Sequence, residues 1–307
     1  MPLSCAASRA SASCNANINV FNADDPEKKA ILERVALDEL QHEIAAAVLL
    51  LESPDGQMLF MASNRQGSLG SNNDIWVALR ASSAGAWEPP LNLGEPVNSA
   101  SNDFCPTPLP GNQLLFVSAR ANTCGGAGNN PDIYYTRLHP VLGWLPPHHL
   151  GCDVNSGSEE FSPSFIEAEG QRMLFFSSNR ADGVNHKIYM SLQQSDGSWG
   201  LATSVDELNM PGAYDARPNV RKDGLEIVFD SNRAGGAPDI YTATRSSVFE
   251  PWSAPQRLGP NVNTASAETR ASLSRDGTRL YFGSNRPGSV ANSVDIYVST
   301  RSGPGRQ

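Results

Sequence analysis

Short apolar segments alternate with polar, glycine-containing turns along most of the chain. The stretch "FDSNRAGGAPDIYTATR", Phe229 to Arg245, is representative of this pattern. An apolar segment runs into Ser-Asn-Arg, a glycine-rich turn follows, and a second apolar segment begins with Asp-Ile-Tyr. Alternating apolar residues on both sides of a Gly-Gly turn predict a β-hairpin. The 26 glycines and 22 prolines of the chain favour many short strands over long helices.

The hairpin phrase occurs five times, with a period of 53 to 60 residues between its arginines. A polar turn that contains glycine precedes each copy: "SPDGQ", "LPGNQ", "EAEGQ", "RKDGL" and "SRDGT". A tryptophan follows four of the copies, and a Val-Asn or Leu-Asn pair follows each tryptophan. These marks are Trp87, Trp144, Trp199 and Trp252, and Asn98, Asn155, Asn209 and Asn263. The regular order of the marks shows an internal repeat.

Each repeat is interpreted as four short strands, named a to d. Strand a ends at the polar turn, strand b carries Leu-Phe-x-x-Ser, strand c carries Asp-Ile-Tyr, and strand d follows the tryptophan. Four antiparallel strands at this period are typical of a β-propeller blade, which needs a neighbour on each side to bury its faces. The sequence therefore predicts an all-β, five-bladed β-propeller over residues 30–303, with an N-terminal extension over 1–29 and a tail over 304–307.

The repeat resembles that of the TolB-like β-propellers, over roughly residues 44–301. The "SPDG" turn at Ser53, the "LFFSSNR" strand at Leu174 and the "DIY" of strand c carry the resemblance. These motifs are specific for the fold and weak for function, because one fold serves many functions. The resemblance implies a non-enzymatic scaffold that binds a protein or another polymer, such as a polysaccharide, through its loop face. It also implies a periplasmic or extracellular protein.

Closure of the ring needs a strand d for the fifth blade, because the chain ends just after strand c of that blade. Two N-terminal segments compete for this place. "VALDEL", from Val35, aligns with "SVDEL" of the third blade. However, "DDPEKKAILERVALDELQHEIAAA" has Pro26 at a first helical position and apolar residues along one face, which predicts a helix. With that helix in place, "NINVFN" (residues 17–22) is the predicted closing strand.

The repeated arginine and aspartate bracket the hairpin between strands b and c. An arginine locks a loop by bidentate bonding to a carboxylate or to carbonyls. Since no ligand needs the same arginine on five blades, we interpret these residues as loop clamps, in which an exposed pair contributes about 0–1 kcal/mol. The clamp residues are Arg65, Arg120, Arg180, Arg233 and Arg286, with Asp74, Asp132, Asp239 and Asp295. The third blade departs from the pattern with His186 and Lys187, which we interpret as drift.

Four carboxylates occupy one equivalent position at the start of strand a: Asp103, Glu160, Asp215 and Glu268. Strand a is innermost in a propeller, so these acids are expected at the mouth of the central channel. Two positions further on, strand alternation is expected to point Cys105, Ser162, Arg217 and Arg270 the same way. The acids either cap loops or, with Arg217 and Arg270, bind a cation or a polar ligand. A glycoside hydrolase, which needs two carboxylates at a suitable separation, is the alternative function.

The five cysteines show no Cys-x-x-Cys spacing, and "PPHHLGC" places two adjacent histidines on opposite faces of a strand. We therefore expect no metal site and no cofactor. Cys105, Cys124 and Cys152 map to the same loop face, where Cys124–Cys152 is the first choice for a disulfide in an exported protein. Free buried thiols are the other interpretation.

Charge and hydropathy exclude two classes of partner. A net charge of −9 argues against nucleic acid, which requires clustered lysine and arginine. No apolar run is long enough for a transmembrane helix. The start, "MPLSCAASRASASC", lacks the pattern of a signal peptide. The expected form is a monomer.

Overall fold

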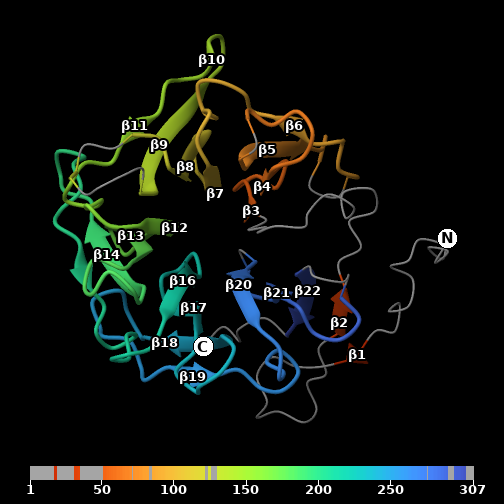
Figure 1. Ribbon diagram of the computed structural model, residues 1–307, viewed down its shortest axis with the longest axis vertical. Helices are drawn as coiled ribbons and strands as arrows, with labels where there is room; N and C mark the ends of the chain where they lie inside the picture. The colour runs from red at the N-terminus through yellow and green to blue at the C-terminus, as the bar shows by residue number, and fades with distance from the viewer. Residues whose placement is uncertain are drawn as a thin grey trace.

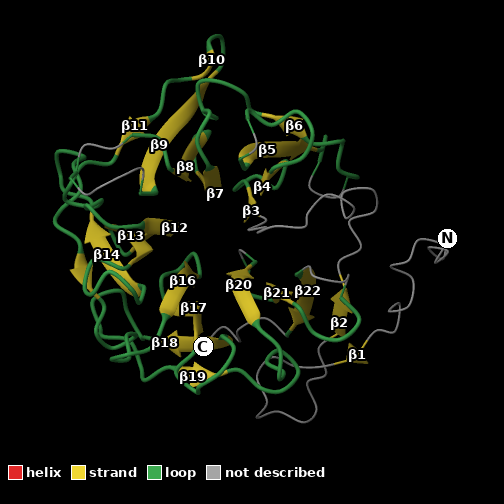
Figure 2. Cartoon of the chain, viewed as in Figure 1, coloured by secondary structure: helices red, strands yellow, loops and turns green. Residues whose placement is uncertain are grey.

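Five antiparallel sheets surround a central axis, with one strand of each sheet innermost (Figure 1). The computed structural model describes the side chains of residues 52–70, 72–82, 85–121, 124–125, 130–274, 276–289 and 294–301, and the backbone of 17–18, 31–34 and Leu51. In this part of the chain every regular element is a strand (Figure 2). The predicted all-β, five-bladed propeller is confirmed. The described residues include no helix that is long and apolar enough to cross a membrane.

Each blade follows the predicted order of strands a to d from the axis outward. Blade one contains β3 (Leu51–Glu52), β4 (Met58–Ser63), β5 (Asp74–Leu79) and β6 (Leu91–Asn92). Blade two contains β7 (Asp103–Leu109), β8 (Gln113–Ser118), β9 (Asp132–His139), β10 (Gly143–Trp144) and β11 (His148–His149). Blade three contains β12 (Glu160–Ala168), β13 (Gln171–Ser178), β14 (Lys187–Leu192) and β15 (Thr203–Ser204). Blade four contains β16 (Asp215–Val220), β17 (Glu226–Ser231), β18 (Asp239–Thr244) and β19 (Gln256–Arg257).

Blade five is completed from the N-terminal part of the chain. It contains β20 (Glu268–Leu273), β21 (Arg279–Ser284) and β22 (Asp295–Thr300), followed by β2 (Ile31–Arg34) and β1 (Asn17–Ile18). Strand β2 pairs antiparallel with β22, with Glu33 opposite Val298. Among the described strands, β1 pairs with β2 alone. An unpaired edge at β22 is thereby covered.

This closure corrects the predicted helix. Residues 31–34 lie inside the predicted helix but form a strand, and they take the place that was predicted for 17–22. The unpaired backbone groups of β22 offer hydrogen bonds that outweigh the local helical propensity, which is a weak preference. The structure describes only residues 17–18 of the predicted closing strand and only residues 31–34 of the predicted helix. The other residues of both segments lie outside the described part.

The aspartates of the turns between strands a and b explain that part of the repeat. The Asp55 carboxylate accepts the amide of Gln57 at 3.0 Å, and Asp276 accepts the amide of Thr278 at 3.0 Å. Such Asx turns are followed by a left-handed residue, and Gly56 and Gly277 have φ of 69° and 68°. Hydrogen bonds from Ser274 and the turn amide lower the pKa of Asp276 to about 2.

The Val-Asn marks hold strand c in place. In blade one, the Asn98 side chain accepts the Ile75 amide at 2.8 Å and donates to the Ile75 carbonyl at 2.9 Å. Asn155 makes the same pair of bonds with Ile133 in blade two. Asn209 and Asn263 repeat them in the next two blades. In these four blades the repeated asparagine therefore satisfies both backbone groups of the isoleucine that is the second residue of strand c, groups that are costly to bury unpaired.

The core lies between adjacent blades. One apolar cluster joins Phe175 of β13 to Ile227 and Phe229 of β17, and Trp252 of blade four packs edge-on against Phe175. A second cluster joins Val228 and Ile240 of blade four to Phe282 of blade five. Each blade thus buries its faces against its neighbours, which makes closure of the ring important for stability.

Removal of residues 1–34 is expected to destabilise blade five, because it deletes β2 and exposes the edge of β22. The melting temperature should fall by several degrees, and hydrogen exchange at Tyr297 and Val298 should accelerate. Removal of residues 1–16 is the control, since it leaves both N-terminal strands in place. Unchanged protection of β22 in the longer deletion would show that the ring closes by another route.

Candidate functional site

The four predicted strand-a carboxylates begin β7, β12, β16 and β20, and each is fully buried in its own loop. Glu160 illustrates the arrangement. Its carboxylate accepts the amide and hydroxyl of Ser156 at 2.7 and 2.6 Å, the hydroxyl of Ser178 at 2.6 Å, and the Arg180 guanidinium at 3.0 Å. Burial raises the pKa of Glu160, while the bonds from Ser156, Ser178 and Arg180 oppose that rise.

The same bonds recur around the ring. Asp103 accepts the amide of Ser99 at 2.7 Å and pairs with Arg120 at 2.9 Å. Asp215 accepts the amide of Met210 at 2.7 Å and pairs with Arg233 at 2.5 Å. Glu268 accepts the amide of Thr264 at 2.8 Å and pairs with Arg286 at 3.4 Å. The acids therefore cap the loops that precede strand a.

The repeated arginines complete these caps. In blades two to five, the arginine bonds to the strand-a acid. It also donates to the serine at the end of strand b and to a backbone carbonyl in the loop before strand a. For Arg180 these acceptors are Ser178 at 3.0 Å and Val154 at 2.5 Å. Arg120, Arg233 and Arg286 contact Val97, Leu208 and Val262 in the same way. In blade one, Arg65 donates to Ser63. From here on, loop clamp means the strand-a acid, the arginine and the serine of one blade, and no longer the arginine with the hairpin aspartate that the sequence suggested.

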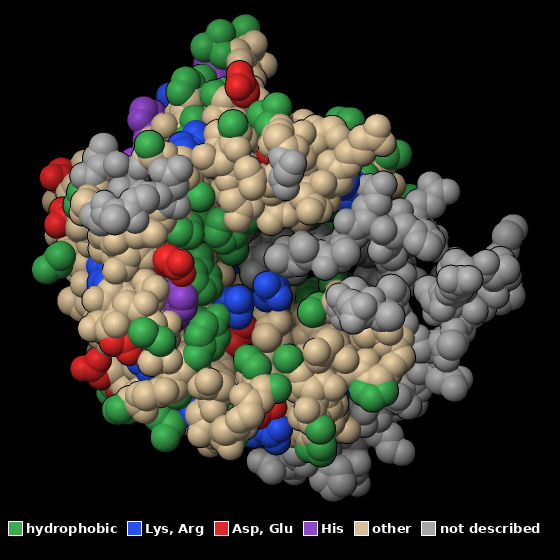
Figure 3. All heavy atoms as spheres, in the orientation of Figure 1, with side chains coloured by type: hydrophobic (Ala, Val, Ile, Leu, Met, Phe, Trp, Pro, Cys, Tyr) green, Lys and Arg blue, Asp and Glu red, His purple; other side chains and the backbone are tan. Residues whose placement is uncertain are grey.

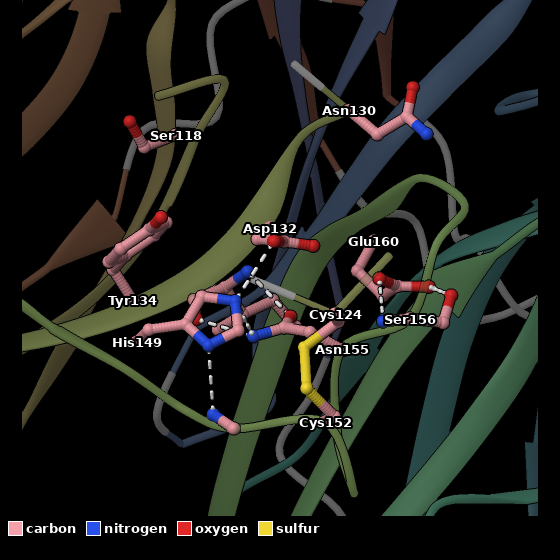
Figure 4. A network of polar contacts seen from close by, with 12 residues as sticks. Ser118, Cys124, Asn130, Asp132, Tyr134, His149, Cys152, Asn155, Ser156 and Glu160 are labelled. Carbon is pink, nitrogen blue, oxygen red and sulfur yellow. Dashed lines mark hydrogen bonds and ion pairs between the residues drawn. A yellow bond between two sulfur atoms is a disulfide. The ribbon is translucent and has the colours of Figure 1, made fainter. Parts of the chain in front are cut away.

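The hairpin aspartates have partners other than these arginines. In blades one, two and four, a residue of strand d contacts the aspartate that begins strand c. Asn92 donates to Asp74 at 2.7 Å, and Arg257 forms two bonds to Asp239 at 2.6 and 2.7 Å. In blade two, His149 contacts Asp132 at 2.9 Å (Figure 4). In blades two and four, the arginine and the hairpin aspartate therefore make separate contacts in place of the expected pairing across the hairpin.

A disulfide joins Cys124 to Cys152, with a Cα–Cα distance of 5.3 Å. It connects the b–c loop of blade two with the segment that follows β11, beside the contact of His149 with Asp132 (Figure 4). The predicted first choice of disulfide is confirmed. Cys105 is a free thiol. No group of three metal-ligating side chains occurs among the residues whose placement is described.

Strand a contains a β-bulge in four blades, just after the clamp acid. The register of β7 with β8 shifts between Phe104 and Thr107, and the corresponding shifts occur in β12, β16 and β20. The bulged residues have positive φ of 50° to 57°, and they are Cys105, Ser162, Arg217 and Arg270. Because a bulge re-aims a side chain, these residues do not share the direction of the acids. The expectation from simple strand alternation is wrong here.

The bulged side chains meet near the axis. The Cys105 sulfur lies 3.5 Å from the Ser162 hydroxyl on the next blade. Arg217 pairs at 2.9 Å with Asp230 of its own blade, and not with the clamp acid Asp215. The backbone amide of Arg270, on blade five, donates to the same Asp230 carboxylate at 2.9 Å. Figure 3 shows basic side chains at the central opening, near the position of β16 and β20.

We call the central opening beside the bulged residues Arg217 and Arg270 the channel mouth. Asp230 and Tyr214 also belong to it, and the sequence analysis missed both. Asp230 lies in "VFDSNR", where the equivalent residues of other blades are Ala62, Val117, Ser177 and Gly283. A charge at a position that is otherwise small or apolar was the available signal. The carboxylate is completely buried, which raises its pKa against the opposing effect of Arg217. Tyr214 precedes the clamp acid of blade four and carries no comparable mark.

No protein-family model matches this chain, and no curated protein matches it. Solved structures do resemble it. TolB from Acinetobacter baumannii is 18% identical with a TM-score of 0.53, over 81% of this chain and 53% of that chain. This chain thus spans about half the length of that TolB.

Two sugar-active enzymes align with more of their own length. The α-L-arabinofuranosidase PaAbf62A from Podospora anserina is 13% identical with a TM-score of 0.52, over 87% of this chain and 94% of that chain. An endo-arabinase from Bacteroides thetaiotaomicron is 14% identical with a TM-score of 0.53, over 86% and 98%. The shared feature is the fold. At these identities the likeness carries no function from either group.

Arg233→Ala is expected to lower the free energy of unfolding by about 2–3 kcal/mol, because it leaves the buried Asp215 carboxylate without its closest cation. The exposed pair of Arg172 with Glu167, at 3.5 Å, supplies the control. Arg172→Ala should change stability by about 0–1 kcal/mol. Urea denaturation of both variants measures the difference, and equal small losses would contradict a buried clamp.

Proposed function

We propose that this protein is a non-enzymatic β-propeller scaffold that binds a protein or another polymer through its loop face. The loop face is the side on which the loops before strand a and the b–c hairpins lie. The use of all four strand-a carboxylates in loop clamps carries this proposal. Each is fully buried and hydrogen-bonded to its own loop.

Glycoside hydrolysis makes a different demand on carboxylates. One must protonate the leaving group while another attacks the sugar or activates water, so both must reach the substrate. The Asp103 carboxylate instead accepts hydrogen bonds from Ser99 and Arg120. The Glu160 carboxylate accepts hydrogen bonds from Ser156 and Arg180. The contacts of the four acids therefore favour a scaffold over the alternative hydrolase.

The disulfide supports a location outside the reducing cytosol. Disulfides persist in oxidising compartments such as the periplasm and the extracellular space, and Cys124–Cys152 closes a loop with a sequence separation of 28. We propose that the protein is periplasmic or extracellular and that it binds its partner as a monomer.

Exposed apolar side chains give the loop face a means of contact. Val184, in the b–c hairpin of blade three, is 74% exposed, and Met210, in the loop before β16, is 45% exposed. Apolar residues of this kind form contact points in protein interfaces. Phe249 is 66% exposed, but it follows β18 in the c–d connection at the other end of the blade.

Turnover is tested first, with the wild type and with Asp103→Asn and Glu160→Gln. We expect no hydrolysis of arabinan or of a panel of aryl glycosides, and no stabilisation by calcium. Both variants should lower the melting temperature because they weaken buried clamps. Hydrolysis by the wild type that either substitution abolishes would overturn the scaffold proposal.

Partner binding is tested with two matched variants, Val184→Glu on the loop face and Phe249→Glu on the opposite face. A partner captured from an extract of the source organism is purified, and its affinity is measured by calorimetry. Val184→Glu should weaken binding by at least about tenfold, since it places an uncompensated charge in the interface, whereas Phe249→Glu should not. The reverse result would assign the partner to the opposite face.

A further inference from the structure

The bulges of blades four and five bring two guanidiniums and one carboxylate together at the channel mouth. Arg217 pairs with Asp230 at 2.9 Å, and the only hydrogen bond of the Arg270 side chain among described residues is a long one, 3.4 Å, to Thr269. Burial, followed by repulsion from Arg217, lowers the pKa of Arg270. Because arginine stays charged in proteins, the three groups carry an excess of one positive charge.

Tyr214 adds an unused donor beside these charges. Its hydroxyl oxygen is buried and has no hydrogen-bond partner among the described residues. The Arg217 guanidinium lies 5.6 Å from the Tyr214 ring centroid. Burial raises the pKa of Tyr214 to about 12, so the hydroxyl keeps its proton at neutral pH. A buried polar group without a partner costs free energy, and a ligand oxygen would relieve that cost.

The wall of the mouth is aromatic on the side of blade three. The ring centroids of Phe161 and His186 are 4.5 Å apart, and those of His186 and Tyr214 are 5.7 Å apart. The His186 imidazole also contacts Glu159 at 3.1 Å. The departure of blade three from the repeat, which the sequence analysis interpreted as drift, thus places His186 against the same cluster.

We propose that this mouth binds a carboxylate group of a ligand, held by the Arg270 guanidinium together with Arg217 and the Tyr214 hydroxyl. Arginine offers a planar fork of N–H donors that matches the two oxygens of a carboxylate. A single negative charge balances the excess positive charge, whereas the Asp230 carboxylate and the net charge of −9 oppose a more highly charged anion. The site goes beyond the proposed function, since a small carboxylate would occupy it whether or not a polymer docks on the loop face.

Two sources of the carboxylate are distinguished by paired probes. Glucuronate is compared with glucose, and a short peptide with a free C-terminal carboxylate is compared with its C-terminal amide. Calorimetry and thermal shift with the whole chain should show millimolar binding of at least one charged probe and none of its neutral counterpart. Binding of glucuronate alone indicates a sugar acid, and binding of the peptide alone indicates a chain end. Binding of both indicates a general carboxylate site.

Variants connect that binding to the named groups. Arg270→Gln should weaken the binding by about tenfold or more, because it removes a charge-assisted contact, and Tyr214→Phe should weaken it by a smaller factor. Neither should unfold the protein, because the pair of Arg217 with Asp230 remains. Arg279→Gln, an exposed arginine of β21, is the matched control and should bind as the wild type does.

Three results would overturn the proposal. One is that neither carboxylate binds to the wild type at millimolar concentration. The second is that Arg270→Gln binds as tightly as Arg279→Gln. The third is that inorganic phosphate, tested in the same way, binds more tightly than both carboxylates, which would contradict the argument from a single excess charge.

Discussion

Burial of a carboxylate at the start of strand a, with an arginine to neutralise it, is the interaction on which the rest of this structure depends. An unpaired buried charge is very costly, whereas a paired and fully hydrogen-bonded one is tolerated. The clamp therefore fixes three parts of a blade at once. It joins the loop before strand a, the end of strand b and the start of the b–c hairpin, as Glu160, Ser178 and Arg180 show. The variable hairpin sequences can then differ without loss of the frame.

The clamps also separate structural charge from charge that is available to a ligand. Acids that begin the inner strands would look catalytic from position alone, but their bonds are used within the loops. In blades two to five a bulge follows the acid, and the bulged residue, two positions further on, has a side chain that takes no part in the clamp. Arg217 and Arg270 stand at these bulges, at φ of 55° and 57°. In these four blades the repeat thus supplies a constant frame and one variable bulged position, and the chemistry of the mouth depends on what occupies that position.

The parts of the fold that recur in every repeat can be predicted from the sequence. The contacts and directions of individual side chains cannot. The blades, their strand order, the Asp-Gly turns and the disulfide follow from local patterns that recur or from loop proximity. The partner of Arg233 could not be predicted, because blade four contains two repeated carboxylates, Asp215 and Asp239, and the sequence does not say which one the arginine reaches. The direction of Arg217 could not be predicted either, since a bulge cancels the alternation of a strand. Residues 31–34 form a strand because the edge of β22 is near in space, which local propensity does not reveal.

A double-mutant cycle between Arg180 and Glu160 tests the buried clamp most directly. Arg180→Ala, Glu160→Gln and the double variant would be unfolded in urea beside the wild type. The clamp predicts a coupling free energy of about 1–3 kcal/mol, because the two side chains contact each other and share the Ser178 hydroxyl. A coupling near zero, with Glu160→Gln alone causing no loss of stability, would contradict the clamp and return Glu160 to the candidates for chemistry.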